Sequence, residues 1–288
     1  FNSGNFKRIV IAEIDQSLVD AVGNNNGTFY VNVATNDGIV TEQIEGIEIF
    51  NPMIEDDKKE IIKALREATE IATSLPSVDF YDTGDSSVAK LIASGLNDST
   101  APATIIYAAE NNNRAAEILE QEVSKYLDIK TKKVQFLNTV IGKMSQITTD
   151  ETMINNMSLK TIAPRSMKAF LVEAFNCILV TKTEIEGFTP GIEVFVEKFD
   201  LLPFEEAKLF GHNAIHALLA YMGLDKGYET MDQITCDPEL MRIASDAFVR
   251  ESGSAMIGKY ASLDDEMFTE AGYTAYAKDL LVRMTNHF

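Results

Sequence analysis

The sequence predicts an α/β protein in two parts: a mostly parallel sheet domain followed by a mainly helical domain. Up to about residue 137, short apolar runs with strand character alternate with amphipathic helical segments. This alternation produces parallel strands joined by crossover helices. After the segment Gly187–Gly191, the best hinge candidate, helical periodicity continues almost to the end of the chain.

Each expected element follows from a local pattern of apolar, capping and turn residues. The expected strands are at 8–12, 29–33, 39–50, 78–81, 103–109 and 133–137, with a further apolar element, read as a strand, at 169–180. The runs at 29–33 and 39–50 flank Asn36-Asp37-Gly38, a hairpin-turn signal, and are expected to be antiparallel. The expected helices are at 16–22, 56–75, 88–96, 113–126, 203–222, 238–257 and 263–284.

Composition narrows the function classes. The chain has 288 residues, 45% of them hydrophobic, which is enough for a large core and two domains. A net charge of −19 argues against nucleic acid or an anionic membrane surface as the main partner. Cys177 and Cys236 are isolated and only three histidines are present, so we expect no metal site. Two thiols and no apolar run of membrane-spanning length predict a cytoplasmic protein.

The most informative segment carries a lysine, an asparagine and a histidine in the spacing Lys-x4-Asn-x2-His. At about 100° per residue of a regular helix, Asn213 lies roughly 140° and His216 roughly 80° round from Lys208. Asp200 and Pro203 are start signals for this helix, and Gly223 can end it. A lysine that can lose its proton, an amide and an imidazole can together move a proton off a hydroxyl. Taken alone, a lysine on an amphipathic helix is usually a solvated side chain.

This segment resembles the signature of the polyol-specific long-chain dehydrogenases, the mannitol dehydrogenase family, which also contains polyol-phosphate dehydrogenases and uronate reductases. Family members carry Pro-aromatic-Glu before the same lysine spacing, as Pro203-Phe204-Glu205 does here, although they often have Leu-Asn where this chain has His212-Asn213. Further matches follow in family order: Ile105–Asn111, Phe136–Val140, Val172–Phe175 and Arg250–Gly253. The family usually continues the second of these with Asp-Arg, where this chain has Gly142-Lys143.

The resemblance implies a Rossmann-like NAD-binding domain over 1–189 and a helical substrate domain over 190–288. A glycine-rich phosphate-binding loop is absent from the sequence, and the strand at 8–12 matches the family's second strand. We therefore expect a chain shortened at both ends. The alternative is a divergent protein that has lost the loop and binds no dinucleotide.

For the cofactor site, the resemblance places Glu13 where an acid binds the adenosine ribose and repels the extra phosphate of NADP, which favours NAD. Thr83 and Gly84 follow the expected strand at 78–81, and Asn111 follows the strand at 103–109. All three are expected at the cofactor cleft, although small or amide residues also suit ordinary turns.

For catalysis, the resemblance implies hydride transfer between a polyol, or polyol phosphate, and NAD, without a metal. Lys208 would be the general acid and base, and Asn138 and Asn213 would donate hydrogen bonds to the reacting oxygen. His216 would orient a substrate hydroxyl. Glu205 would relay protons or tune the lysine, unless it only suits the helix N-terminus.

The substrate prediction rests on residues 29–52, which look more like the phosphate-specific branch of the family. Mannitol 1-phosphate and fructose 6-phosphate are therefore the expected pair, in a monomer or dimer. The alternatives are a uronate (tagaturonate or fructuronate) reductase, a mannitol 2-dehydrogenase, and a non-catalytic sugar-phosphate-binding protein on the same scaffold.

Overall fold

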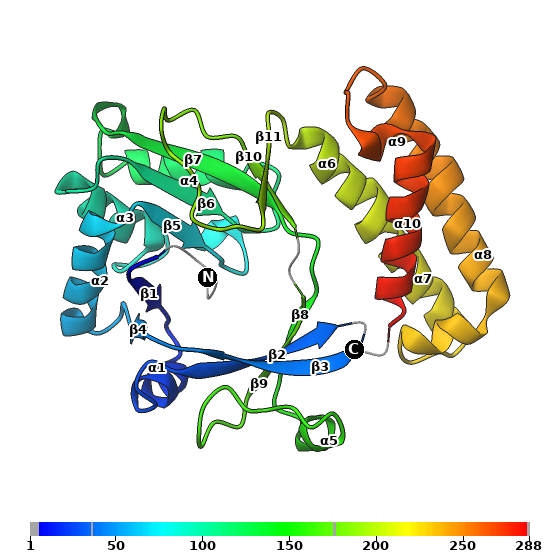
Figure 1. Cartoon of the computed structure of the whole chain (residues 1–288), viewed down its shortest axis with the longest axis horizontal. Coiled ribbons are helices and arrows are strands. Elements are labelled where there is room, and N and C mark those ends of the chain that lie inside the picture. The colour runs from blue at the N-terminus through cyan, green and yellow to red at the C-terminus, as the bar shows by residue number, and fades with distance from the viewer. Residues whose placement is uncertain (1–5, 36, 175–176, 287–288) are drawn as a thin grey trace. The chain divides into compact units, whose positions relative to one another are not determined.

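The computed structural model describes residues 6–35, 37–174 and 177–286. The chain forms two compact units, Phe1–Phe199 and Asp200–Phe288 (Figure 1). The sequence predicts a boundary after residue 189, whereas the compact units divide after Phe199. Strand β11 (Phe195–Lys198) pairs in parallel with β10 (Ile178–Thr181), and this pairing keeps the intervening segment with the sheet.

The first unit alternates strands and helices, as the sequence predicts. Its other strands are β1 (Ile9–Ala12), β2 (Phe29–Thr35), β3 (Gly38–Ile44), β4 (Ile47–Phe50), β5 (Glu70–Thr73), β6 (Thr104–Ala108), β7 (Val134–Val140), β8 (Ser145–Thr148) and β9 (Ala169–Glu173). Its helices are α1 (Gln16–Gly23), α2 (Glu55–Glu67), α3 (Val88–Asn97), α4 (Ala115–Ser124) and α5 (Glu151–Asn156), with short 3-10 helices η1 (Val78–Phe80) and η2 (Ile129–Thr131).

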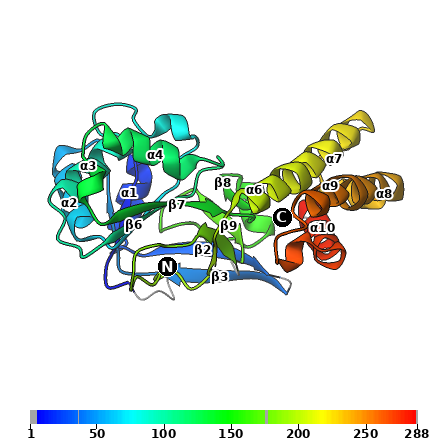
Figure 2. The same cartoon turned by 90° about the horizontal axis from the view of Figure 1, so that it is seen from above.

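The largest sheet has the order β11-β10-β7-β6-β5, in which β5, β6 and β7 run parallel. Figure 2 shows α3 and α4 along one face of β6 and β7. The core on that face is built from side chains of α3, α4, β6 and the turn at Tyr81. All five residues of β6 are buried, because a central parallel strand is covered on both faces.

A separate parallel pair joins β1 to β4. Together, β4-β1 and β5-β6-β7 match the doubly wound order 3-2-1-4-5-6 when β1 and β4 take positions 2 and 3 and β5 to β7 take positions 4 to 6. The α/β fold class is therefore confirmed. The second position for the strand at 8–12 stays an expectation of the resemblance.

A third sheet, β3-β2-β9-β8, is inserted into this pattern. The predicted hairpin is confirmed by the antiparallel pairing of β2 with β3, in which Thr35 lies opposite Gly38; Asn36 lies outside the described residues. The fully buried Asn32 stabilises this sheet: its Nδ2 donates to the carbonyls of Lys160 and Phe170, and its Oδ1 accepts from the Lys160 N–H. Every polar atom of a buried amide needs such a partner.

Several predicted elements of the first unit are wrong. The helix expected at 56–75 ends at Glu67, and β5 follows it; residues 78–80 form a 3-10 helix rather than a strand. The run at 39–50 divides into β3 and β4, and β4 pairs in parallel with β1. The apolar element at 169–180 is likewise two strands, β9 and β10.

The second unit is helical, as predicted. It contains α6 (Leu202–Ala207), the π turn η3 (Lys208–Asn213), α7 (Ala214–Asp225), the 3-10 helix η4 (Asp232–Cys236), α8 (Pro238–Asp246), the π turn η5 (Ala247–Gly253), α9 (Ser254–Lys259), the 3-10 helix η6 (Glu266–Phe268) and α10 (Glu270–Met284). Figure 2 shows α6 and α7 as one uninterrupted helix.

Candidate active site

The Lys208 helix begins where its capping residues predict. The Asp200 carboxylate accepts a hydrogen bond of 2.9 Å from the backbone N–H of Leu202, and Pro203 occupies the first turn. The helix continues through Gly223, the predicted end, and stops at Asp225. Within it, Glu205 lies on α6, Lys208 and Asn213 are the first and last residues of η3, and His216 lies on α7.

The π turn changes the geometry expected for a regular helix. The Ala214 N–H donates to the carbonyl of Leu209, five residues earlier. A π turn contains more residues than an α turn. Lys208 and Asn213 are therefore about one full turn of the helix apart, whereas a regular α-helix would place them nearly one and a half turns apart. The expected separation of roughly 140° is therefore wrong, and the two side chains lie closer to one line along the helix.

The surroundings of Lys208 shift the pKa of its ammonium group. Lys208 is half-buried, and this burial lowers the pKa of its ammonium group. The carboxylate of Glu205, one turn earlier and only 7% exposed, acts in the opposite direction and raises the pKa of Lys208. The effect of burial is the larger of the two, so the amine loses its proton more easily than an ordinary lysine does.

Two imidazoles accompany the lysine. His216 is half-buried, and its ring centroid lies 6.3 Å from that of His212, which is buried within the π turn. The structure thus brings four of the predicted site residues, Glu205, Lys208, Asn213 and His216, onto a single helix. A lysine with a lowered pKa beside an amide and an imidazole can exchange a proton with a hydroxyl and hydrogen-bond its oxygen.

Asn138 lies on β7 in the first unit, with its amide bound to the start of α4. Its Oδ1 accepts a hydrogen bond of 2.8 Å from the Ala116 N–H, and its Nδ2 donates to Glu117 at 2.8 Å. These bonds fix the amide orientation and dock α4 against the sheet. An amide nitrogen carries two N–H groups, and Glu117 accepts one of those of Asn138. The predicted hydrogen bond from Asn138 to the substrate oxygen would therefore use the other.

Glu13 follows β1 directly, at the carboxyl end of the strand. One carboxylate oxygen accepts a hydrogen bond of 2.8 Å from the backbone N–H of Asp15, and the residue is half-buried. Asp15 in turn caps α1 and pairs with Lys168. The acid therefore has the place in the sheet at which a dinucleotide-binding strand presents a carboxylate.

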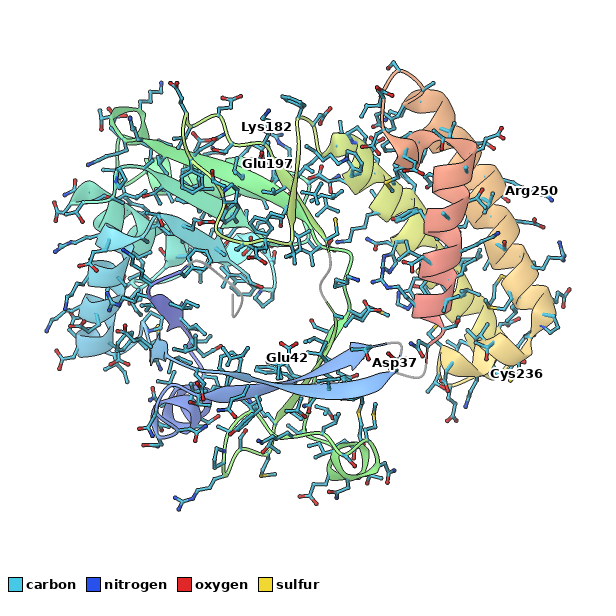
Figure 3. All side chains as sticks on the ribbon, in the orientation of Figure 1. Asp37, Glu42, Lys182, Glu197, Cys236 and Arg250 are labelled. Atoms are coloured by element: carbon cyan, nitrogen blue, oxygen red, sulfur yellow. The ribbon has the colours of Figure 1, made fainter. Side chains whose placement is uncertain are left out.

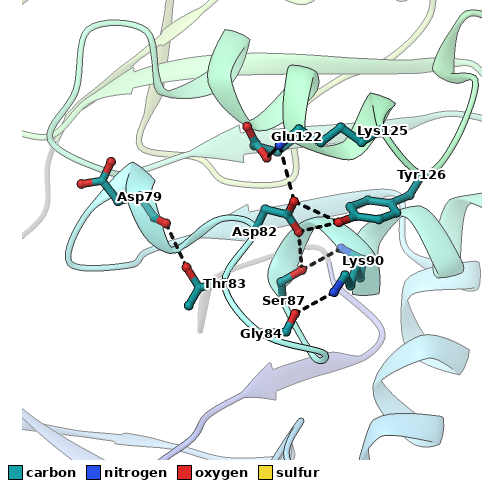
Figure 4. Close-up of polar contacts among 9 residues, drawn as sticks. All are labelled: Asp79, Asp82, Thr83, Gly84, Ser87, Lys90, Glu122, Lys125 and Tyr126. Carbon is teal, nitrogen blue, oxygen red and sulfur yellow. Dashed lines mark hydrogen bonds and ion pairs between the residues drawn. The ribbon is translucent and has the colours of Figure 1, made fainter.

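Thr83 and Gly84 do not follow a strand, because η1 precedes them. Thr83 Oγ1 donates to the carbonyl of Asp79 at 3.0 Å, and Lys90 Nζ donates to the carbonyl of Gly84 at 2.9 Å (Figure 4). The neighbouring Asp82 accepts hydrogen bonds from the hydroxyls of Ser87 and Tyr126. These contacts hold a turn onto α3 and α4, and the strand on which the predicted cofactor role depended is absent here.

The carboxyl ends of β5 and β6 carry residues that sequence reasoning missed. Glu110, only 4% exposed, accepts hydrogen bonds from the hydroxyls of Thr73 and Tyr81 and from the backbone N–H of Leu75. Thr73 ends β5, and Asn111, which is exposed, follows Glu110. Because β5 and β6 are parallel, their ends share one edge, where open α/β sheets bind ligands. In the sequence, Glu110 of the Glu110-Asn111 pair was the feature that could have indicated this buried acid at the edge of the sheet.

Within the described ranges, no group of three or more metal-ligating side chains gathers. No helix of the described chain is both long and apolar enough to cross a bilayer.

Of the remaining family motifs, Glu173 accepts a hydrogen bond from the Met144 N–H, whereas Phe175 lies outside the described residues. Arg250–Gly253 lies within η5, and Arg250 projects from the outer side of the helix (Figure 3).

The α/β fold and the sequence can both be compared with known proteins. No protein-family model matches the chain. Mannitol-1-phosphate 5-dehydrogenases from Buchnera aphidicola subsp. Acyrthosiphon pisum, strains Tuc7 and APS, are 28% identical over 287 residues, which cover 97% of this chain and 67% of the relative. The ordered match over nearly the whole chain is what the motifs predict.

Solved structures agree with this match. Mannitol 2-dehydrogenase of Pseudomonas fluorescens, in a ternary complex with NAD and D-mannitol, superposes with a TM-score of 0.70 at 16% identity, covering 98% of this chain and 63% of that one. A substrate-free D-sorbitol dehydrogenase gives a TM-score of 0.76 at 13% identity, covering 97% and 64%. The chain is thus similar to polyol dehydrogenases in sequence and in fold, and it spans about two thirds of the length of these proteins.

Proposed function

We propose that this chain forms the catalytic part of an NAD-dependent oxidoreductase that interconverts a polyol, or polyol phosphate, and the corresponding ketose. One observation carries the proposal: in a chain similar to polyol dehydrogenases, a wide helical turn carries Lys208, with a lowered pKa, and Asn213, and His216 follows on the same helix. The first compact unit would bind the cofactor and the second the substrate.

The first unit fits a dinucleotide in two respects. Strands β5, β6 and β7 form a parallel sheet, and a half-buried carboxylate, Glu13, follows β1, which would take the second position of a doubly wound sheet. Glu13 would hold the ribose hydroxyls and disfavour NADP, while Asn111 and the Thr73 end of β5 would line the same edge. Thr83 and Gly84 would contribute to cofactor binding from the turn that follows η1. When bound, NAD supplies the hydride acceptor or donor.

During oxidation, Lys208 Nζ would take the proton from the substrate hydroxyl as the carbon loses its hydride. In reduction the same ammonium group would return the proton to the carbonyl oxygen. Asn213 and Asn138 would donate hydrogen bonds to that oxygen while it carries negative charge. His216 would orient an adjacent hydroxyl, and Glu205 would adjust the charge on the lysine or relay its proton.

Mannitol 1-phosphate and fructose 6-phosphate are the favoured pair. The curated relatives at 28% identity are named for mannitol 1-phosphate, whereas the structural neighbours at 16% and 13% identity act on unphosphorylated polyols by name. The resemblance of residues 29–52 to the phosphate-specific branch points the same way.

The test is NADH oxidation by the full-length protein with fructose 6-phosphate, fructose and a keto-uronate offered in parallel. We expect turnover with fructose 6-phosphate to exceed the other two. Faster turnover with fructose would indicate a mannitol 2-dehydrogenase, and faster turnover with the keto-uronate would indicate a uronate reductase. Absence of both turnover and NADH binding would overturn the proposal and favour a non-catalytic sugar-phosphate-binding protein.

A further inference from the structure

The second unit contains two π turns in different helices that contact each other. The turn η3 includes Lys208 and Asn213, and η5 interrupts the helix formed by α8 and α9. A π turn weakens a helix by adding a residue to one turn, and such turns are frequently found at functional sites. The surrounding structure must therefore stabilise both turns.

Gly211 lies at the contact, inside the first π turn. A Cβ atom on Gly211 would lie 2.6 Å from Phe248 Cε2 and 3.0 Å from Tyr273 Oη. Phe248 and Tyr273 are both fully buried. The two rings therefore fill the space that a side chain at position 211 would need, and they pack against the widened turn at Gly211.

The same two rings reach the second π turn. Phe248 belongs to η5, and its ring packs edge-on against that of Tyr273, with centroids 6.1 Å apart. A Cβ atom on Gly253, the last residue of η5, would lie 3.0 Å from Tyr273 Cδ1. A hydrogen bond of 2.9 Å joins Ser252 Oγ to Tyr273 Oη. Tyr273, from α10, thus bridges both turns.

The register of η3 decides how Lys208 and Asn213 are related. If the turn reverted to α geometry, one residue would be displaced and the two side chains would separate by roughly a further 100° around the axis. Such a change moves the backbone at Gly211 and so alters its close approach to Phe248 and Tyr273. The packed rings oppose the change.

We propose that Phe248 and Tyr273 hold the Lys208–Asn213 turn in its π register and are positioning residues for the lysine and the amide. The expected effect of these rings on turnover rests on the proposed function. Their effect on the position of Lys208 does not. Neither ring touches the reacting atoms on this account; both act through the backbone of Gly211.

The test compares Gly211→Ala with two matched glycine substitutions in the same unit. Gly258→Ala on α9 adds a methyl group where nothing lies within 4 Å. Gly223→Ala on α7 adds one 2.7 Å from Ile234 Cδ1, away from η3. The readouts are kcat and KM for the ketose, NADH affinity, and the NMR titration of Lys208 in protein labelled with 13C at lysine Cε, assigned with Lys208→Arg.

We expect Gly211→Ala to lower kcat by about 100-fold, because misplacing a catalytic group by about 1 Å has an effect of that size. The titration midpoint of Lys208 should move, and NADH affinity should stay unchanged. Phe248→Leu in the Gly211→Ala background should restore at least part of kcat by making room for the methyl group. The two control substitutions should leave kcat and the titration unchanged.

If Gly211→Ala does not fold, Tyr273→Phe replaces it, since this change keeps the ring and removes only the bond to Ser252. It should lower kcat about fivefold, as the loss of one neutral hydrogen bond would, and Ser252→Ala should do the same. Wild-type kcat and an unmoved Lys208 titration in these variants, or equal effects from Gly223→Ala, would overturn the inference. An inactive wild type would overturn the proposed function alone, because the NMR titration still decides the inference.

Discussion

The hydroxyl of Tyr81 donates a hydrogen bond to the buried carboxylate of Glu110, which joins η1 to the end of β6. Burial and this negative charge raise the pKa of Tyr81. The same carboxylate holds Thr73 and Leu75, so three donors converge on two oxygens at the carboxyl edge of the sheet. A single acid thereby fixes the loop that follows β5.

Replacing Glu110 with Gln should destabilise the first unit by about 2 kcal/mol, because one carboxylate oxygen becomes an N–H₂ group that faces a donor. Urea denaturation of the Glu110→Gln variant measures this change. Glu120→Gln, an exposed acid on α4, serves as the control and should stay within about 0.5 kcal/mol of the wild type. Equal stabilities of the two variants would show that the Glu110 bonds contribute nothing.

The lowered pKa of Lys208 predicts a pH-dependent stability difference. The folded lysine releases its proton at a lower pH than the unfolded lysine, whose pKa is near 10.5. The cost of burying the charge is complete below the folded pKa and disappears as the pH rises toward 10.5. The wild type should therefore gain stability relative to Lys208→Met between pH 7 and pH 10.

Denaturation curves at several pH values in this window measure the difference. Lys278→Met, an exposed position on α10, should show no such trend. A wild type that loses stability relative to Lys208→Met as the pH rises would contradict the lowered pKa.

Replacing Glu13 with Ser should reduce the preference for NADH over NADPH by about tenfold, because one repulsive charge near the extra phosphate is removed. Competition of NADPH with NADH in steady-state kinetics gives the ratio. Glu42→Gln, an exposed acid on β3 (Figure 3), should leave the ratio unchanged. An unaltered ratio in Glu13→Ser would leave Glu13 as the acceptor for the Asp15 N–H and nothing more.

Asn138 has a structural role and a proposed catalytic one, and a single variant separates them. Asn138→Ala should lower stability by about 1 kcal/mol, since the start of α4 loses its bond to Oδ1. It should also lower kcat by about 100-fold if the amide stabilises the oxyanion. Asn155→Ala on α5 is the control. Reduced stability with an unchanged kcat would remove Asn138 from the active site.

Local sequence patterns predicted the elements that packing reinforces. Strand β6 is apolar throughout, and α3 has a Ser87 cap, so pattern and packing agree there. Strand β5 was missed because Glu70–Thr73 follows a good amphipathic helix without a break, and only its pairing with β6 makes it a strand. Ser77 caps the next turn as a 3-10 helix, which overrides the β-like composition of residues 78–80.

The residues of the candidate site stay a prediction, whereas the regular-helix geometry expected for Lys208 and Asn213 was wrong. No local rule at 3.6 residues per turn reveals the π turn at Lys208. Gly211 and Gly253 were the available signals, but their meaning depends on Phe248 and Tyr273, which come from other parts of the chain. The prediction of Lys208, Asn213 and His216 as site residues came from the ordered family motifs, not from local helix rules.

The most direct test of the account compares kcat/KM of the wild type and Lys208→Ala over a range of pH with fructose 6-phosphate, or the preferred ketose, and NADH. We predict a loss of at least about 1,000-fold in Lys208→Ala, as expected for a removed general acid, with unchanged NADH affinity. Lys278→Ala should match the wild type. Turnover by Lys208→Ala within a few fold of the wild type would contradict the assignment of Lys208 as the acid and base.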